Sequence, residues 1–121
     1  MTTSPTQSEH HHRIDYIELA ATDLPQVKRF YEAVFGWRFE DYGPSYTSFH
    51  DGRLAGGFTT QFPVTPGGPL IVLYSKELEA TLARVREAGG RIVKDIFSFP
   101  GGRRFHFMDP SGNELAVWSE P

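Results

Sequence analysis

Hydrophobic and polar residues follow the same order in two successive blocks of this chain. The first block begins with a β-prone run at residues 14–20 and continues with apolar residues at helical spacing, Leu24, Val27, Phe30, Tyr31 and Val34. Asp23 and Gln26 form a capping pair at the start of this predicted helix, and Gly36 ends it. Three short strands are predicted next, at residues 37–42, 46–50 and 53–60.

The pattern starts again after residues 62–69, FPVTPGGP, a Pro/Gly hinge that suits neither a helix nor an inner strand. A strand is predicted at 70–75, a helix from Leu78 to the glycines at 89–90, and strands at 91–96, 103–108 and 113–119. An offset of 54 residues places Leu19 on Leu73 and Gly36 on Gly90, which indicates an internal repeat.

The repeat predicts an α+β fold of two tandem βαβββ modules, with one helix covering one face of each sheet. The first module spans residues 14–61, the hinge 62–69 and the second module 70–121, together forming one compact domain. Residues 1–13 are predicted to be a disordered tail, and its histidines at positions 10–12 are given no role.

Composition then excludes several classes of function. A net charge of −3 lacks the basic surface of a nucleic-acid-binding protein. The absence of cysteine excludes disulfides, thiolate metal ligands and cysteine nucleophiles. The chain shows neither an apolar signal-peptide region at its start nor an apolar run of about 20 residues, so a cytoplasmic protein without a membrane partner is expected.

Two stretches resemble parts of the vicinal-oxygen-chelate superfamily, which includes glyoxalases, bleomycin-resistance proteins and dioxygenases. Residues 16–37, YIELAATDLPQVKRFYEAVFGW, resemble the opening strand and helix, with an acidic N-cap, an aromatic pair and a Gly–Trp exit. Residues 107–118, FMDPSGNELAVW, resemble the turn and last strand of the second module. With the hinge, the resemblance covers residues 14–120.

The resemblance implies sheets that curl around a cavity, usually completed as a homodimer. In metal-dependent members the cavity holds a divalent ion, and the implied ligand positions in this chain are Tyr16, Gly57, Leu70 and Ala116. Glycine, leucine and alanine side chains provide no metal donor, and a neutral tyrosine is a poor one. The sequence therefore predicts a metal-free branch of the superfamily that needs no cofactor.

Strand alternation from these positions predicts an aromatic-rich cavity with few polar groups, which is typical of small-molecule sites. The aromatic rings are expected to stack on a planar or cationic ligand, and the glutamates to pair with a cationic group. The predicted ligand-binding residues are Tyr16, Glu18, Tyr46, His50, Phe58, Tyr74, Arg104, His106, Glu114 and Trp118. Competing interpretations are dimer packing for Phe58 and Trp118 and a satisfied, buried histidine for His106. For residues 100–104, PGGRR, one interpretation is an anionic group held by backbone amides and arginine, but the run lacks a helix N-terminus, and a flexible turn with a solvated rim is expected.

Three functions fit these observations. The first is a metal-independent binding protein of the glyoxalase and bleomycin-resistance family, with an aromatic or cationic small molecule as its partner. The second is a metal-independent lyase or isomerase that uses Glu18, His50 or His106 as acid or base. The third is a metalloenzyme, a lyase or dioxygenase, with relocated ligands such as His50, His106 and one glutamate.

Overall fold

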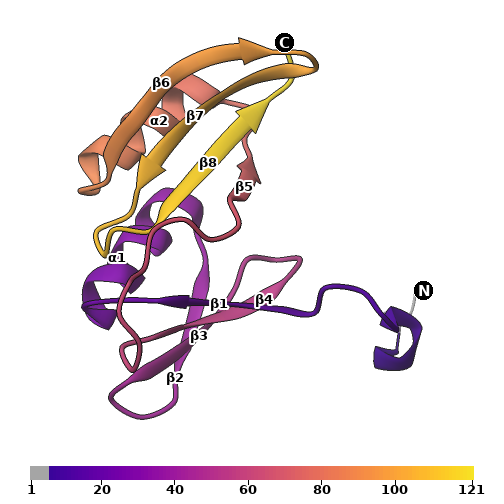
Figure 1. Cartoon of the computed structure of the whole chain (residues 1–121), viewed down its shortest axis with the longest axis vertical. Helices are drawn as coiled ribbons and strands as arrows, with labels where there is room; N and C mark the ends of the chain where they lie inside the picture. The colour runs from indigo at the N-terminus through magenta and orange to yellow at the C-terminus, as the bar shows by residue number, and fades with distance from the viewer. Residues whose placement is uncertain (1–5) are drawn as a thin grey trace.

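The computed structural model describes residues 6–121 and contains two βαβββ modules, each a four-stranded mixed sheet with one helix (Figure 1). The first module consists of β1 (Tyr16–Ala20), α1 (Leu24–Phe35), β2 (Arg38–Asp41), β3 (Tyr46–His50) and β4 (Ala55–Thr59). The second consists of β5 (Ile71–Tyr74), α2 (Leu78–Glu87), β6 (Arg91–Phe99), β7 (Gly102–Met108) and β8 (Glu114–Ser119). The predicted fold class is confirmed, and a helix or strand is found in each of the predicted segments.

The two sheets have the same strand order, β1-β4-β3-β2 and β5-β8-β7-β6. In each sheet the first and last strands of the module pair in parallel, and the other neighbours are antiparallel. The internal repeat inferred from the sequence is therefore a repeat of topology. It leaves β1 and β5 as edge strands at equivalent positions.

Residues outside the two modules contribute little to the core. Of the predicted tail, residues 1–5 lie outside the described residues, and Gln7–His10 form a 3-10 helix, η1, without a buried side chain. The predicted hinge belongs to residues 60–70, which contain no helix or strand and are called the linker below. Within the described part of the chain, no helix is both long and apolar enough to cross a membrane.

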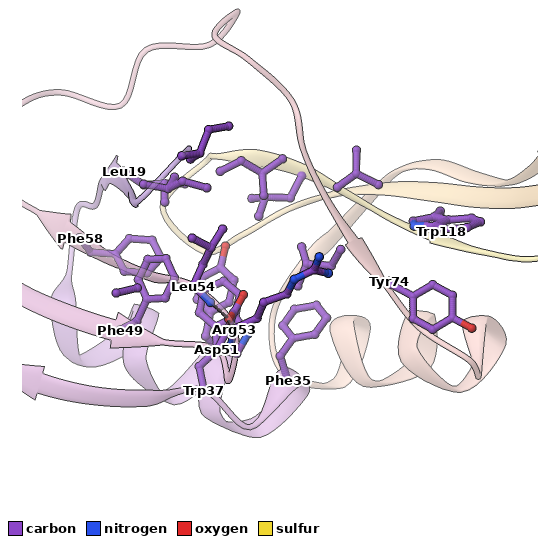
Figure 2. Close-up of a pocket in the computed structure, with 18 of the residues that line it drawn as sticks. Leu19, Phe35, Trp37, Phe49, Asp51, Arg53, Leu54, Phe58, Tyr74 and Trp118 are labelled. Carbon is purple, nitrogen blue, oxygen red and sulfur yellow. Dashed lines mark hydrogen bonds between the residues drawn. The ribbon is translucent and has the colours of Figure 1, made fainter. Parts of the chain in front are cut away.

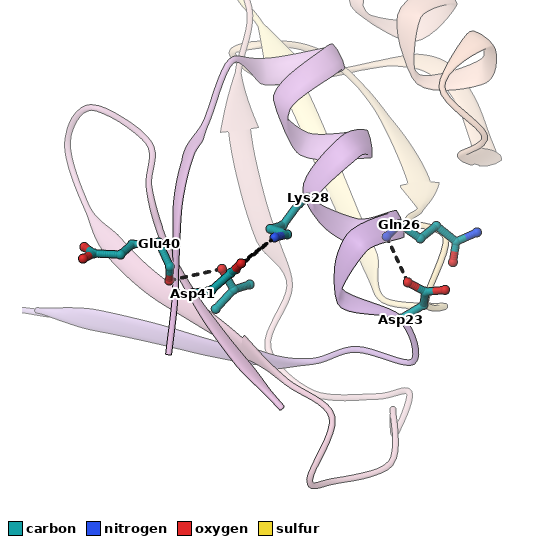
Figure 3. Close-up of polar contacts among 6 residues, drawn as sticks. Asp23, Gln26, Lys28, Glu40 and Asp41 are labelled. Carbon is teal, nitrogen blue, oxygen red and sulfur yellow. Dashed lines mark hydrogen bonds and ion pairs between the residues drawn. The ribbon is translucent and has the colours of Figure 1, made fainter. Parts of the chain in front are cut away.

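Helix α1 begins and ends where the capping residues predict. The Asp23 carboxylate accepts a hydrogen bond from the backbone N–H of Gln26 at 3.0 Å, an interaction that typically stabilises a helix by about 1 kcal/mol (Figure 3). Gly36 adopts the left-handed conformation, with φ 71°, that a glycine reaches without steric cost. On the exposed side, Lys28 pairs with Asp41 at 2.9 Å and lowers the pKa of that carboxyl group, which ties α1 to β2.

One aromatic core links the two modules, and α1 lies between their sheets (Figure 1). The ring of Phe30 in α1 lies 5.9 Å from that of Phe107 in β7. In the first module Trp37 stacks between Tyr31 and Phe49, with 4.5 Å between ring centroids on each side. Because the helix-side residues of both sheets pack on α1, the modules share a single core.

A hydrogen-bond network centred on Asp109 joins the modules through polar groups. The Asp109 side chain is buried, and its carboxylate accepts hydrogen bonds from the Tyr31 hydroxyl at 2.9 Å and from the backbone N–H groups of Ser111 and Asn113 at 2.9 and 3.0 Å. The Asn113 side-chain amide donates in turn to the backbone carbonyl of Ala20 at 2.8 Å. The turn before β8 is therefore fixed to both α1 and the end of β1.

Burial raises the pKa of Asp109, because the loss of hydration outweighs the hydrogen bonds that favour its charged form. A carboxyl group with a higher pKa in the folded state binds its proton more tightly there. Its contribution to stability is complete below the unfolded pKa of about 3.9 and is lost as the pH rises through the folded pKa.

We therefore expect the free energy of unfolding of the wild-type protein, relative to that of Asp109→Asn, to decrease as the pH rises from about 4 to about 7. The asparagine variant does not titrate at this position, so it removes the contributions of all other groups from the comparison. Urea unfolding followed by circular dichroism measures both free energies. A difference that grows with pH would show that the hydrogen bonds outweigh the desolvation.

Candidate functional site

The open face of the first sheet, the face that α1 does not cover, carries the predicted site residues of β1 and β3. Tyr16 and Glu18 are exposed there, and Tyr46 is half-buried. The intervening Leu19 of β1 and Phe49 of β3 turn toward the core. The predicted orientation of these two strands agrees with the structure, because successive side chains of a strand point to opposite faces.

Three side chains on this face form a hydrogen-bond chain. The Tyr46 hydroxyl donates to Glu18 Oε2 at 3.0 Å and is also hydrogen-bonded to the Tyr16 hydroxyl. Since the single Tyr46 proton is used on Glu18, the Tyr16 hydroxyl is the donor in the second bond. Burial of Tyr46, together with its two partners, raises its pKa, so it remains protonated at neutral pH. The chain holds Glu18 in place as an oriented carboxylate.

Gly57 in β4 provides the space for this chain. A Cβ atom at Gly57 would overlap the Tyr46 hydroxyl, so a phenol group from the neighbouring strand fills the position at which the resemblance implies a metal ligand. The resemblance also implies metal ligands at two positions of the second module. Leu70 at the first is 39% exposed, and Ala116 at the second is fully buried. Residues 6–121 contain no group of three or more histidine, aspartate or glutamate side chains that could hold a metal ion. The donors present do not fit the metal of the metal-dependent members.

Phe58 lies in the core, and the prediction that it lines the open face is wrong. Its side chain is fully buried, 5.2 Å from the ring of Tyr31 and 5.5 Å from that of Phe49. Gly57 faces the open side, so the next residue of the strand has to face the helix. A regular strand does not allow Gly57 and Phe58 to lie on the same face.

The open face of the second sheet carries His106 of β7 beside Glu114 of β8. His106 Nδ1 lies 2.9 Å from Glu114 Oε2, and the imidazole is only 3% exposed. When the imidazole is neutral and its Nδ1–H donates to this carboxylate, Nε2 is an acceptor. Nε2 is buried and has no partner among the described residues. The competing interpretation of a fully satisfied histidine therefore holds for only one of its two nitrogens.

Arg104 lies on the same face, in contact with two rings that the sequence analysis missed. Its guanidinium carbon is 5.4 Å from the ring centroid of Phe97 and 5.5 Å from that of Phe99, both in β6. The prediction that residues 100–104 form a solvated rim is therefore wrong for Arg104, whose Nε atom is buried. The prediction agrees with the position of Arg103, which pairs with the exposed Glu79 of α2. The sequence signal for the two phenylalanines was their spacing of two residues, but the strand was predicted to end before them.

His50 lies apart from these groups, at the end of β3. Its Nδ1 accepts a hydrogen bond from the backbone N–H of Gly52 at 3.0 Å, which supports the turn between β3 and β4. Within one chain, the structure does not bring His50, His106 and a glutamate together as a metal site.

Two clefts lie beside the modules. The first, called the linker cleft, has a volume of about 980 Å³ and is enclosed in part by linker residues 63–70. Tyr16 and Glu18 line it from the first module, and Met108 and Glu114 line it from the second. The linker cleft therefore brings together the two glutamates that the sequence analysis assigned to a cationic ligand.

The second cleft, called the ring cleft, has a volume of about 790 Å³ (Figure 2). Trp118 and Tyr74 line it from the second sheet, with their rings in an edge-to-face arrangement at 5.3 Å. Trp37 and Phe35 line it from the first module, and the buried Phe58 lies in its inner wall. The predicted single cavity is thus divided within one chain, with the carboxylates in one cleft and the exposed aromatic rings of the second sheet in the other.

The sequence profile of the Glyoxalase/Bleomycin resistance protein/Dioxygenase superfamily matches residues 13–117. The chain therefore belongs to this superfamily. A glyoxylase-like domain-containing protein of Didymella fabae is 27% identical over an alignment of 126 positions, gaps included. The alignment covers 92% of this chain and 96% of that protein. Some other curated relatives are about twice as long, and the chain spans 44% or 45% of their length.

Solved structures of similar fold include proteins described as enzymes and as binding proteins. A glyoxalase-related enzyme from Fulvimarina pelagi has a TM-score of 0.77 at 22% identity, with 91% of this chain and 89% of that chain covered. TnmS3, an antibiotic binding protein from Streptomyces sp. CB03234, has a TM-score of 0.72 at 22% identity, with 90% and 96% covered. At this identity the likeness shows the fold.

The space above Gly57 leads to a prediction about stability. In Gly57→Ala the new methyl group would displace the Tyr46 hydroxyl, so we expect the free energy of unfolding to fall by about 1–3 kcal/mol. Gly68→Ala is the matched control, because no atom lies within 4 Å of the added Cβ, and its effect should stay within about 0.5 kcal/mol. Chemical denaturation measures both. Equal effects of the two substitutions would contradict the packing described for Gly57.

Proposed function

We propose that this protein binds a cationic aromatic small molecule in the linker cleft without a metal ion. The observation that carries the proposal is the presence of Glu18 and Glu114 in one cleft, contributed by different modules. A protonated amine between two carboxylates gains charge-assisted hydrogen bonds, which are stronger than those between neutral groups.

The carboxylates are available for such a ligand. Among the described residues, neither Glu18 nor Glu114 forms an ion pair with a lysine or arginine. Each is oriented by a group behind it, Glu18 by the Tyr46 hydroxyl and Glu114 by His106. Preorganised charges lose less conformational entropy on binding than free side chains do.

The aromatic part of the ligand is inferred from Tyr16, which lines the linker cleft and is 44% exposed. A tyrosine ring attracts both a flat aromatic surface and a cation. The description of TnmS3 as an antibiotic binding protein supports a binding role for this fold. Metal independence is supported by the side chains at Gly57, Leu70 and Ala116, none of which is a metal ligand.

The test uses 1-naphthylmethylamine as the cationic probe and 1-naphthalenemethanol as its neutral counterpart. Calorimetry should show that Glu18→Gln and Glu114→Gln each weaken binding of the amine by about tenfold or more, since each removes a charged hydrogen-bond acceptor. Glu87→Gln, an exposed position at the end of α2, is the matched control and should bind as the wild type does. If both probes bind equally, or if all three variants bind alike, the cationic ligand is excluded.

Metal content is measured on the same protein with His10, His11 and His12 replaced by alanine, so that the histidines of the tail do not contribute. We expect inductively coupled plasma mass spectrometry to find less than about 0.1 equivalents of Zn, Ni, Mn or Fe per chain, because the donor set is wrong for these ions. One equivalent of metal per chain that survives dialysis would overturn metal independence. The cationic ligand would still be tested by the calorimetry.

A lyase or isomerase is the second candidate, and the contact between Glu114 and His106 favours it. A carboxylate that holds the Nδ1–H of an imidazole fixes the tautomer whose Nε2 can accept a proton. The two functions differ in what happens to the bound molecule. For a binding protein, nuclear magnetic resonance spectra of the recovered probe are unchanged after long incubation, whereas an enzyme would release a modified compound.

We also propose that the chain forms a homodimer through the exposed edge strand β5. Val72 is 42% exposed on this strand, and exposed apolar edge strands are usually covered by a partner. Sedimentation velocity should give twice the chain mass of 13.7 kDa, and Val72→Asp should shift it toward the monomer. A wild-type monomer at all concentrations would contradict the dimer.

A further inference from the structure

We infer that Arg104 forms a second binding site, a subsite for the carboxylate of an aromatic ligand on the open face of the second sheet. This inference does not depend on the proposed cation site, because it uses a different charge, Arg104, which does not line the linker cleft. Three features of Arg104 carry it: its unpaired charge, the rings that hold it, and the residues beside it.

Arg104 is a cation without an acidic partner. The ion pairs among the described residues are those of Lys28 with Asp41, Arg103 with Glu79 and His106 with Glu114, and none involves Arg104. The Nε atom of Arg104 is buried and unpaired as well. A guanidinium group remains charged at any physiological pH, so an anion is the ligand that compensates it best.

The rings of Phe97 and Phe99 lie beside the guanidinium group of Arg104. Both centroids lie within 5.5 Å of its central carbon, a distance at which the faces of aromatic rings attract a cation. The N–H groups of a guanidinium group lie in its plane, where a ligand can reach them from the edge. Two neighbouring N–H groups in that plane match the two oxygens of a carboxylate.

The residues around Arg104 indicate that the rest of the ligand is aromatic. Trp118 is the cross-strand partner of Arg104, and Tyr74 is the partner of Trp118 on the next strand. A Cβ atom on Gly102 would overlap the backbone carbonyl oxygen of Ser119 and approach Trp118 Cε3 to 3.2 Å, so glycine allows β8 to lie close to β7 at this point. The indole and phenol rings line the ring cleft, where they can stack on an aromatic ligand (Figure 2).

His106 adds a second unpaired group on the same face. It lies two residues from Arg104 on β7, and the Phe97 ring lies 5.9 Å from its imidazole. Its buried Nε2 has a free lone pair when Nδ1–H donates to Glu114. The ligand class is therefore an aromatic carboxylate.

The experiment measures binding of 1-naphthoate and of the uncharged 1-naphthamide to the full-length protein by fluorescence and calorimetry. We expect the carboxylate to bind at least about tenfold more tightly than the amide, as is usual for an additional charged hydrogen bond. Arg104→Gln should remove this preference. Arg103→Gln, the neighbouring arginine that pairs with Glu79, is the matched control and should retain it.

Arg104→Lys keeps the charge but loses the planar pair of N–H groups, so it should bind the carboxylate more weakly than the wild type. It also serves if the glutamine variant fails to fold, which thermal unfolding detects. Glu87→Gln should leave naphthoate binding unchanged, because Glu87 is exposed and lines neither cleft. The cation site is measured separately with 1-naphthylmethylamine, so that failure of this subsite and failure of the cation site can be distinguished. Equal affinity of wild type and Arg104→Lys for naphthoate, an equal loss in Arg103→Gln, or no naphthoate binding to the wild type would overturn the inference.

Discussion

The buried carboxylate of Asp109 is the interaction on which the arrangement of the two modules depends. It is placed in the second module, but Tyr31 of the first module supplies one of its donors. Tyr31 is also stacked on Trp37 in the aromatic core, so the same residue serves both the apolar and the polar side of the junction. Because a buried carboxylate without its donors is costly, the modules cannot separate at this point without losing several interactions together.

The junction also builds the linker cleft. Asn113 binds the backbone carbonyl of Ala20, the last residue of β1, and β8 begins with Glu114 directly after it. The start of β8 is thereby placed next to the strand that carries Glu18. Neither module holds two carboxylates in this cleft by itself, and the contact between Asn113 and Ala20 is what brings one from each together. The candidate site is thus a consequence of how the modules are joined.

Much of this could be predicted from the sequence, because local patterns determine it. The caps of α1 at Asp23 and Gly36 and the alternation in β1 and β3 require only neighbouring residues. The DPSGN run was identified as a turn, but its role at the junction depends on Tyr31, which lies 78 residues away in the chain. Side chains that act across such distances leave no periodic signal.

Two other failures of the sequence reasoning have local causes. Phe58 was assigned to the face that its neighbour Gly57 occupies, although the alternation of a strand excludes this. The contact of Arg104 with Phe97 was missed because the strand was predicted to end at residue 96. In the structure β6 continues to Phe99, with register irregularities before Phe97 that interrupt its regular pairing with β7. A charged residue after a Gly–Gly turn is most often solvated, and only the length of β6 shows that two rings cover this one.

Glu18 and Arg104 are held by different means, and we expect this difference to favour ligands of opposite charge. Glu18 is exposed, and its carboxylate is held in place by a hydrogen bond from the Tyr46 hydroxyl. Arg104 lies close to the rings of Phe97 and Phe99, where a lysine ammonium would lose more hydration than the rings return, whereas a guanidinium group is weakly hydrated and flat. A hydroxyl beside a carboxylate favours an incoming cation, and a guanidinium group without an acidic partner favours an incoming carboxylate. At the positions where the resemblance implies metal ligands this chain has Gly57, Leu70 and Ala116, and fixed organic charges of opposite sign are a means of selecting a ligand that requires no metal ion.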